Sequence, residues 1–135
     1  MNNTINDFIV AAANELTGNI SGALHVSGGV SYENFVWNTD LYKGTIPTKD
    51  EVMNKAQELF DKEAMRRLRI ERDLLLVKTD WVVTKAAETG VAESDAWKIY
   101  RQALRDLPST QTPVMENPVV SMVGITSVTW PTKPS

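Results

Sequence analysis

The sequence contains no cysteine and one histidine, His25, and these two shortages exclude several kinds of site. Without cysteine there is no disulfide, no thiolate metal site and no thiol nucleophile. A lone histidine without a second nitrogen or sulfur ligand does not make a zinc site, so we expect no metal and no cofactor. We expect His25 to be a surface or packing residue.

Nucleotide-binding glycine motifs and long apolar segments are also missing. The one glycine cluster, Gly28-Gly29, fits no phosphate-binding pattern. The longest apolar stretch runs only from Phe8 to Ala13, which is too short to cross a membrane. The acidic side chains alternate with lysine and arginine, as is usual for solvated carboxylates rather than catalytic ones. We therefore expect a protein that is not an enzyme and does not bind a membrane.

The net charge of −3 over 135 residues argues against a general nucleic-acid-binding protein. A basic cluster at Arg66–Arg72 leaves nucleic-acid binding as a minor alternative, although Glu63, Glu71 and Asp73 offset much of its charge. The length predicts one domain, or one domain with appendages. The start, Met1–Thr4, lacks the basic segment of a secretory signal, so we expect a chain used in a cytoplasm or assembled there into something larger.

The first part of the chain predicts a short helix followed by a β-hairpin. Apolar residues recur at helical spacing over residues 5–16, with Asn3 or Thr4 available as the cap. Two strands, residues 23–26 and 30–37, are expected on either side of a Ser-Gly-Gly turn. The helix is short and its apolar face is mostly alanine, so it needs another element to pack on.

Residues 49–78 predict one long charged helix. Thr48 and Glu51 can form a capping box at its start, and an apolar stripe runs from Met53 to Leu75. A helix of this length would span about 45 Å at a rise of about 1.5 Å per residue. A compact chain of this size would be under about 40 Å across, so we expect the helix to bend back or to use its stripe on other chains.

A second helix is expected to begin after Ser94 and to end at Pro108, because the residue before a proline avoids the α region. Its apolar stripe includes Trp97 and Tyr100. Residues 82–90 are weakly patterned and predict a connector. The two helices should therefore fold back as an antiparallel pair.

The last part of the chain predicts extended structure. Residues 108–118 carry three prolines and predict a linker, and residues 119–130 are rich in β-branched side chains and predict a strand with a kink at Gly124. Such a strand needs a sheet to join. That sheet is either the 19–37 hairpin or the edge of another protein.

The expected fold class is therefore α+β. It comprises an N-terminal short helix and β-hairpin, a long charged amphipathic helix paired with a second helix striped with tryptophan and tyrosine, and a C-terminal extended strand with a proline-rich tail. The corresponding divisions of the chain are residues 1–47, residues 48–108 and residues 109–135.

The tryptophans are the expected partner-binding side chains, because tryptophan and tyrosine are enriched among interface anchors. Trp97 and Tyr100 lie on the stripe of the second helix, so packing in the chain's own core is the stronger expectation for both. Trp81 follows the long helix and is open to either role. Trp37 ends an expected strand, and Trp130 is equally open to contact with a partner or with a distant part of its own chain.

Several motifs occur in a fixed order in the C-terminal half: Arg69–Leu76, then Thr79-Asp80-Trp81, then Ala96–Pro108 with its run Tyr-Arg-Gln-Ala-Leu-Arg-Asp-Leu-Pro, and finally Val128–Pro134 with a Trp-Pro pair. In this combination they resemble the phage tail assembly chaperones, small proteins that often accompany tail fibres. The likeness extends over residues 30–135 and is strongest over residues 69–108.

The resemblance implies a non-enzymatic protein that binds a trimeric phage tail fibre and assists its folding, assembly or attachment in the cytoplasm of the infected host. Some such proteins stay in the finished virion. The alternative is a permanent structural adaptor at the junction of fibre and baseplate, with baseplate or other tail proteins as partners. The expected partner-binding residues are Trp37, Trp81, Trp97, Tyr100, Val128, Trp130 and Pro131.

A β-rich trimeric fibre folds slowly through non-local contacts and exposes strand edges on the way. We hypothesise that the 119–130 strand or the 19–37 hairpin contacts the β-structure of the fibre, while the helical pair holds the module rigid.

Overall fold

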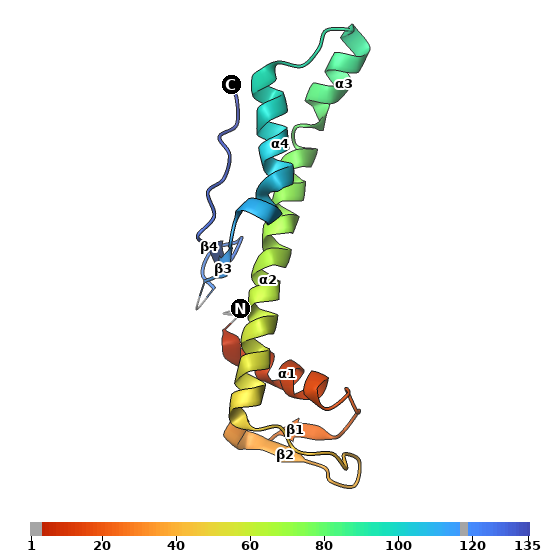
Figure 1. Ribbon diagram of the computed structural model, residues 1–135, viewed down its shortest axis with the longest axis vertical. Coiled ribbons are helices and arrows are strands. Elements are labelled where there is room, and N and C mark those ends of the chain that lie inside the picture. Colours follow the sequence, from red (N-terminus) through yellow and green to blue (C-terminus); the bar gives the residue numbers. More distant parts are fainter. Residues whose placement is uncertain (1–3, 117–118) are drawn as a thin grey trace. The chain divides into compact units, whose positions relative to one another are not determined.

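The computed structural model describes residues 4–116 and 119–135, which form two compact units (Figure 1). Unit 1 comprises the chain up to Glu63 with a short segment ending at Val120, and unit 2 comprises Ala64–Glu116 and Ser121–Ser135. Helices dominate and the strands form two small antiparallel pairs, which confirms the α+β class. The three-part division expected from the sequence stays a prediction.

Unit 1 begins with a 3-10 turn, η1 (Ile5–Phe8), that runs into helix α1 (Ile9–Leu16). The Thr4 backbone N–H donates to the Asp7 carboxylate at 2.7 Å, which satisfies one donor at the helix start. The expected cap at Thr4 is confirmed, while Asn3 lies outside the described residues.

The expected hairpin is confirmed, but its second strand is shorter than predicted. Strands β1 (Leu24–Val26) and β2 (Phe35–Trp37) pair antiparallel. Residues 32–34 form a 3-10 turn, η2 (Tyr32–Asn34), instead of continuing the strand. Asn34 explains the difference, because its carbonyl accepts the Ser27 N–H at 2.9 Å and its side-chain amide donates to the Gly29 carbonyl at 2.6 Å. These bonds close the loop around Gly28, whose φ of +103° favours glycine.

The core of unit 1 lies between α1 and the first turns of α2 (Lys49–Val77). Small side chains allow the two helices to pack closely, with every buried member of the cluster at most 1% exposed: Ile9, Ala12, Ala13, Val52 and Ala56.

Polar contacts fix unit 1 around this core. The Tyr32 hydroxyl donates to the Pro47 carbonyl at 2.8 Å, and so joins the hairpin loop to the segment before α2. Lys55 lies 3.2 Å from Glu15 of α1 and 3.3 Å from Glu58. The carboxylate of Glu15 and then that of Glu58 raise the pKa of Lys55 above its ordinary value.

Helix α2 begins with the predicted capping box. The Thr48 N–H donates to Glu51 Oε2 at 2.9 Å, and the Glu51 N–H donates to Thr48 Oγ1 at 3.2 Å. The stripe of α2 is buried as expected, but it serves two cores in turn. Ala56 packs in the core of unit 1 and Leu68 in the core of unit 2. One 29-residue helix thus supplies both units.

Unit 2 pairs the second half of α2 with α4 (Asp95–Thr110), as the sequence predicts. The helices run antiparallel, because Arg101 of α4 reaches the Leu76 carbonyl while Arg72 of α2 reaches the Arg105 carbonyl. Ser94 caps α4 by accepting from the Trp97 N–H at 3.5 Å. The buried core is formed by Leu68, Tyr100, Leu104 and Leu107.

The expected connector at residues 82–90 is wrong, because these residues belong mostly to a helix, α3 (Asp80–Thr89). A turn at Lys78–Thr79 separates it from α2, and the Thr79 hydroxyl donates to the Leu76 carbonyl at 2.9 Å within that turn. No glycine or proline occurs in residues 48–89, and Gly90 ends α3 with a φ of +69°. Burial of Val82, which is 5% exposed, supplies the packing that the weak pattern did not predict.

Pro108 does not end α4, which continues to Thr110. A proline removes one backbone donor, whose partner here would be the Leu104 carbonyl one turn earlier. Because Pro108 lies in the last turn, the following residues still bond normally, and the Gln111 N–H donates to the Leu107 carbonyl at 2.9 Å.

The expected long strand at residues 119–130 is also wrong. Only β4 (Ile125–Thr126) is extended, and it pairs antiparallel with β3 (Val114–Met115) in the segment predicted as a linker. Positive φ angles of +75° at Gly124 and +62° at Ser127 limit the strand on both sides. Its partner within the chain is therefore β3 and not the 19–37 hairpin. Pro118 lies outside the described residues.

Replacement of Leu104 by alanine should lower the free energy of unfolding of unit 2 by about 2–5 kcal/mol, because a fully buried leucine leaves a cavity. Urea denaturation followed by tryptophan fluorescence reports mainly on unit 2, which holds Trp81, Trp97 and Trp130. Ile99→Ala on the same helix is the control and should cost no more than about 0.5 kcal/mol, because Ile99 is 69% exposed. Equal losses of unfolding free energy in the two variants would contradict the placement of Leu104 in the core.

Candidate partner-binding surface

Six of the seven predicted partner-binding residues lie in unit 2, and the seventh, Trp37, lies in unit 1. The ring of Trp37 lies 6.2 Å from that of Phe35 and 5.7 Å from that of Tyr42, centre to centre. It is half-buried against the core of unit 1. The structure therefore gives Trp37 a packing role of its own, separate from the other six.

Trp81, Trp97 and Tyr100 form a row of edge-to-face aromatic rings. The Trp81 and Trp97 rings are 5.7 Å apart at 77°, and the Trp97 and Tyr100 rings are 6.0 Å apart at 76°. Burial decreases along the row, since Tyr100 is 5% exposed and Trp81 is 52% exposed. Tyr100 is thus a core residue, and Trp81 offers the most surface to a partner.

Arg101 holds the junction between α2 and α3 in place. Its Nη1 donates to the Leu76 carbonyl at 3.1 Å and to Thr79 Oγ1 at 2.6 Å, and its Nη2 lies 3.0 Å from the Asp80 carboxylate. The arginine is only 8% exposed. Because Trp81 directly follows Asp80, these Arg101 contacts also help to position the Trp81 ring against Trp97.

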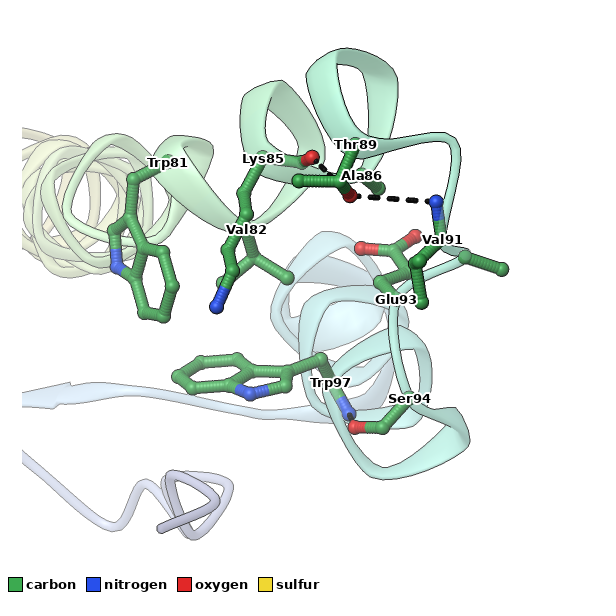
Figure 2. A pocket seen from close by; sticks show the side chains of 10 residues that line it. Trp81, Val82, Lys85, Ala86, Thr89, Val91, Glu93, Ser94 and Trp97 are labelled. Carbon is green, nitrogen blue, oxygen red and sulfur yellow. Dashed lines mark hydrogen bonds between the residues drawn. The ribbon is translucent and has the colours of Figure 1, made fainter.

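A pocket of about 260 Å³ opens between α3 and the start of α4 (Figure 2). Trp81 and Trp97 form one side of it, and the Lys85 side chain extends toward the two rings. Its lining is mostly apolar, with Glu93 in the loop before α4 as the acidic member. Lys85, Glu93 and Arg101 were not predicted from the sequence as members of a site, because no local pattern indicates that they lie close together.

The C-terminal tail packs along α4 within unit 2 (Figure 1). Val128 and Trp130 are half-buried against the core around Leu104, and the Thr129 N–H donates to the Gln111 side chain at 2.9 Å. Pro131 lines two shallow grooves between the tail and α4. Trp130 therefore contacts its own chain, which was one of the two roles expected for it.

A second apolar surface, which was not predicted from the sequence, lies on the outer side of α2. Ile70, Leu74 and Val77 are 46%, 50% and 66% exposed, although all three are large and apolar. A groove of about 380 Å³ brings Ile70 and Leu74 together with Met122, which is fully exposed, and Val123. We call these five residues the α2 patch. The i, i+4, i+7 spacing of its helical members was a signal available in the sequence.

No cluster of three or more histidine, cysteine or acidic residues that could hold a metal ion occurs in residues 4–116 and 119–135. The basic cluster is engaged within the chain, since Arg72 bonds to Asp73 at 2.6 Å and Arg66 and Arg67 also have interaction partners. Among the described helices, none is both long and apolar enough to span a bilayer.

One of three comparisons with known proteins finds a relationship. The family model of the phage tail assembly chaperone proteins matches residues 65–135, more than half of the chain. No curated protein and no solved structure matches the chain. The matched segment begins inside α2 and includes α3, α4, both short strands β3 and β4 and the C-terminal tail, whereas Trp37 lies outside it.

Replacement of Arg101 by methionine should lower the free energy of unfolding of unit 2 by about 2–3 kcal/mol, because it removes a charged donor from the Leu76 carbonyl and leaves the buried Thr79 hydroxyl oxygen without its donor. The same change should shift the Trp81 indole N–H signal in an NMR spectrum. Asp80→Asn is the matched control. It should cost less than about 1 kcal/mol, since the Asp80 side chain is 60% exposed and its ion pair is screened. An equal loss of unfolding free energy in the two variants would mean that Arg101 does not stabilise unit 2 through its bonds to Leu76 and Thr79.

Proposed function

The chain belongs to the phage tail assembly chaperone family, and on this premise we propose that it binds a trimeric tail fibre protein through the α2 patch and assists its folding, assembly or attachment. The family gives the chain a role in phage tail assembly and implies that it binds tail proteins. We propose in addition that the tail protein is a fibre, that the fibre is trimeric and that it binds at the α2 patch. The site of action would be the cytoplasm of the infected host.

The observation that carries this proposal is the exposure of the α2 patch within the family-matched segment. Ile70, Leu74 and Met122 expose apolar side chains in a groove that Arg66, Arg67 and Glu71 also line, and exposed apolar surface with polar residues around it is typical of protein-interaction sites. Trp81, the second residue of α3, is 52% exposed and offers an aromatic side chain of the kind that dominates interface energies.

A partly folded fibre is a fitting occupant for this surface. Its strands expose apolar side chains and unpaired edges until the trimer closes, because non-local β-pairing forms slowly. A helix face that covers apolar side chains without donating a strand would protect them and could be released when the trimer forms. This replaces the hypothesis of a spare strand at residues 119–130, because β4 is paired with β3.

Co-expression with the fibre encoded beside this chain tests the proposal, with size-exclusion chromatography and light scattering as the measurement. Wild-type chain should co-elute with the fibre, or the fibre should become soluble and trimeric only in its presence. Leu74→Asp should weaken this binding about tenfold or more, since one buried leucine contributes roughly 1.5–3 kcal/mol.

Ile99→Asp is the control for that experiment, because it places the same charge at an exposed apolar position of α4 outside the patch. It should bind as the wild type does. A fibre that folds normally and never binds would contradict the proposal. Mass spectrometry of purified virions then separates the two roles, since a stoichiometric signal of this chain supports a permanent adaptor at the fibre–baseplate junction and its absence supports a released chaperone.

A further inference from the structure

The pocket between α3 and α4 contains a carboxylate oxygen without a donor. Glu93 Oε2 is buried and has no hydrogen-bond partner among the described residues. Figure 2 shows the Glu93 carboxylate turned toward α3, on the inner side of the loop. A buried carboxylate oxygen without a donor is costly, so a donor that enters the pocket and reaches it would be favoured.

The pocket's own cation does not supply that donor. Lys85 lines the same pocket, but no ion pair joins it to Glu93 in the part of the chain that the structure describes. Figure 2 shows its side chain extending toward Trp81 and Trp97 instead. The geometry thus already places a cationic side chain next to the two indoles and leaves the carboxylate free.

The aromatic wall favours a cation as the occupant. Trp81 and Trp97 meet at 77°, so their rings present differently oriented faces to the pocket. The face of an indole attracts a cation more strongly than any other side-chain ring does. Trp81 is 52% exposed, so a partner can reach its ring without unfolding the chain.

The acidic side chain that lines the pocket is Glu93, whose charge is opposite to that of a cation. The nearby Asp80 is already paired with Arg101 at 3.0 Å. A volume of about 260 Å³ lies below the roughly 300–1,000 Å³ of small-molecule sites. The pocket therefore suits one inserted side chain better than a cofactor.

We propose that this pocket binds an arginine side chain of the tail protein partner, with the guanidinium against the Trp81 and Trp97 rings and donating to Glu93. A guanidinium is planar, stacks on aromatic rings and donates two parallel hydrogen bonds to a carboxylate, which an ammonium does not. This inference rests on the proposed function for the identity of the partner, but its test does not need the partner.

The test is an NMR titration of the ¹⁵N-labelled full chain with arginine blocked at both ends as its N-acetyl amide. The chain has four tryptophans, so the indole N–H signals provide an internal comparison. Saturable shifts of Trp81 and Trp97, with Trp37 unmoved, are the expected result. Blocked citrulline amide, which has the same shape without the charge, should cause no such shifts.

Two variants assign the effect to Glu93. Glu93→Gln keeps the shape of the side chain and should weaken arginine binding about tenfold or more, because a charged hydrogen bond is lost. Glu88→Gln is the matched control on α3, since Glu88 is exposed and does not line the pocket. It should leave binding within about twofold of wild type, as expected for a screened surface charge.

Any of three outcomes would overturn the inference: no saturable shift at Trp81 and Trp97, an equal response to blocked citrulline or blocked lysine amide, or undiminished binding by Glu93→Gln. Fibre co-elution separates this failure from failure of the proposed function. If the Glu93→Gln chain binds the fibre as the wild type does, the arginine pocket is contradicted and the proposed function is not. If the chain binds arginine but never binds the fibre, the proposed function is contradicted and the arginine pocket is not.

Discussion

The arrangement of unit 2 depends on a buried arginine. Arg101 lies on α4 and donates to the Leu76 carbonyl and the Thr79 hydroxyl, at the point where α2 gives way to α3. Backbone carbonyls at the end of a helix lack intrahelical donors, and the guanidinium supplies one of them from a neighbouring helix. The chain therefore turns at Lys78–Thr79, and α3 is brought against α4. The Trp81–Trp97 contact and the pocket beside it both follow from that turn.

The second constraint is that one helix serves two cores. The buried stripe of α2 packs against α1 in unit 1 and against α4 in unit 2, so each half of the helix is stabilised by different partners. The opposite side of its second half is covered only in part, by Met122 and Val123. Ile70, Leu74 and Val77 remain exposed there. The exposure of the α2 patch is thus a consequence of how α2 is shared, and the patch lies within the segment that the family model matches.

The elements that were predicted correctly are those whose sequence signals lie within a few residues of one another. The capping box at Thr48 and Glu51, the cap at Ser94 and the stripe of α4 all depend on residues within a few positions of one another, and all are confirmed. Helix α3 was missed because its stability comes from Val82 burial and from Arg101, more than ten residues away. The pairing of β3 with β4 was missed because two-residue strands carry no periodic pattern.

The candidate site shows the same division. The aromatic residues Trp81, Trp97 and Tyr100 were predicted from residue type and spacing, and the structure brings them into one row. Glu93 gave no signal, because a single glutamate in a loop is unremarkable until its oxygen is seen to be buried without a donor. Leu74 did have a helical pattern, but the longer buried stripe of α2 dominated it.

Site-specific photo-cross-linking tests the central claim most directly, namely that the outer face of α2 in unit 2 contacts the tail protein. A benzophenone amino acid would replace Leu74 in the α2 patch and, in a second chain, Ile20, an apolar residue of unit 1 that is 39% exposed. Each chain would be irradiated during co-expression with the fibre. The account predicts a covalent adduct with the fibre from position 74 and none from position 20. An adduct from position 20 with none from position 74 would contradict it.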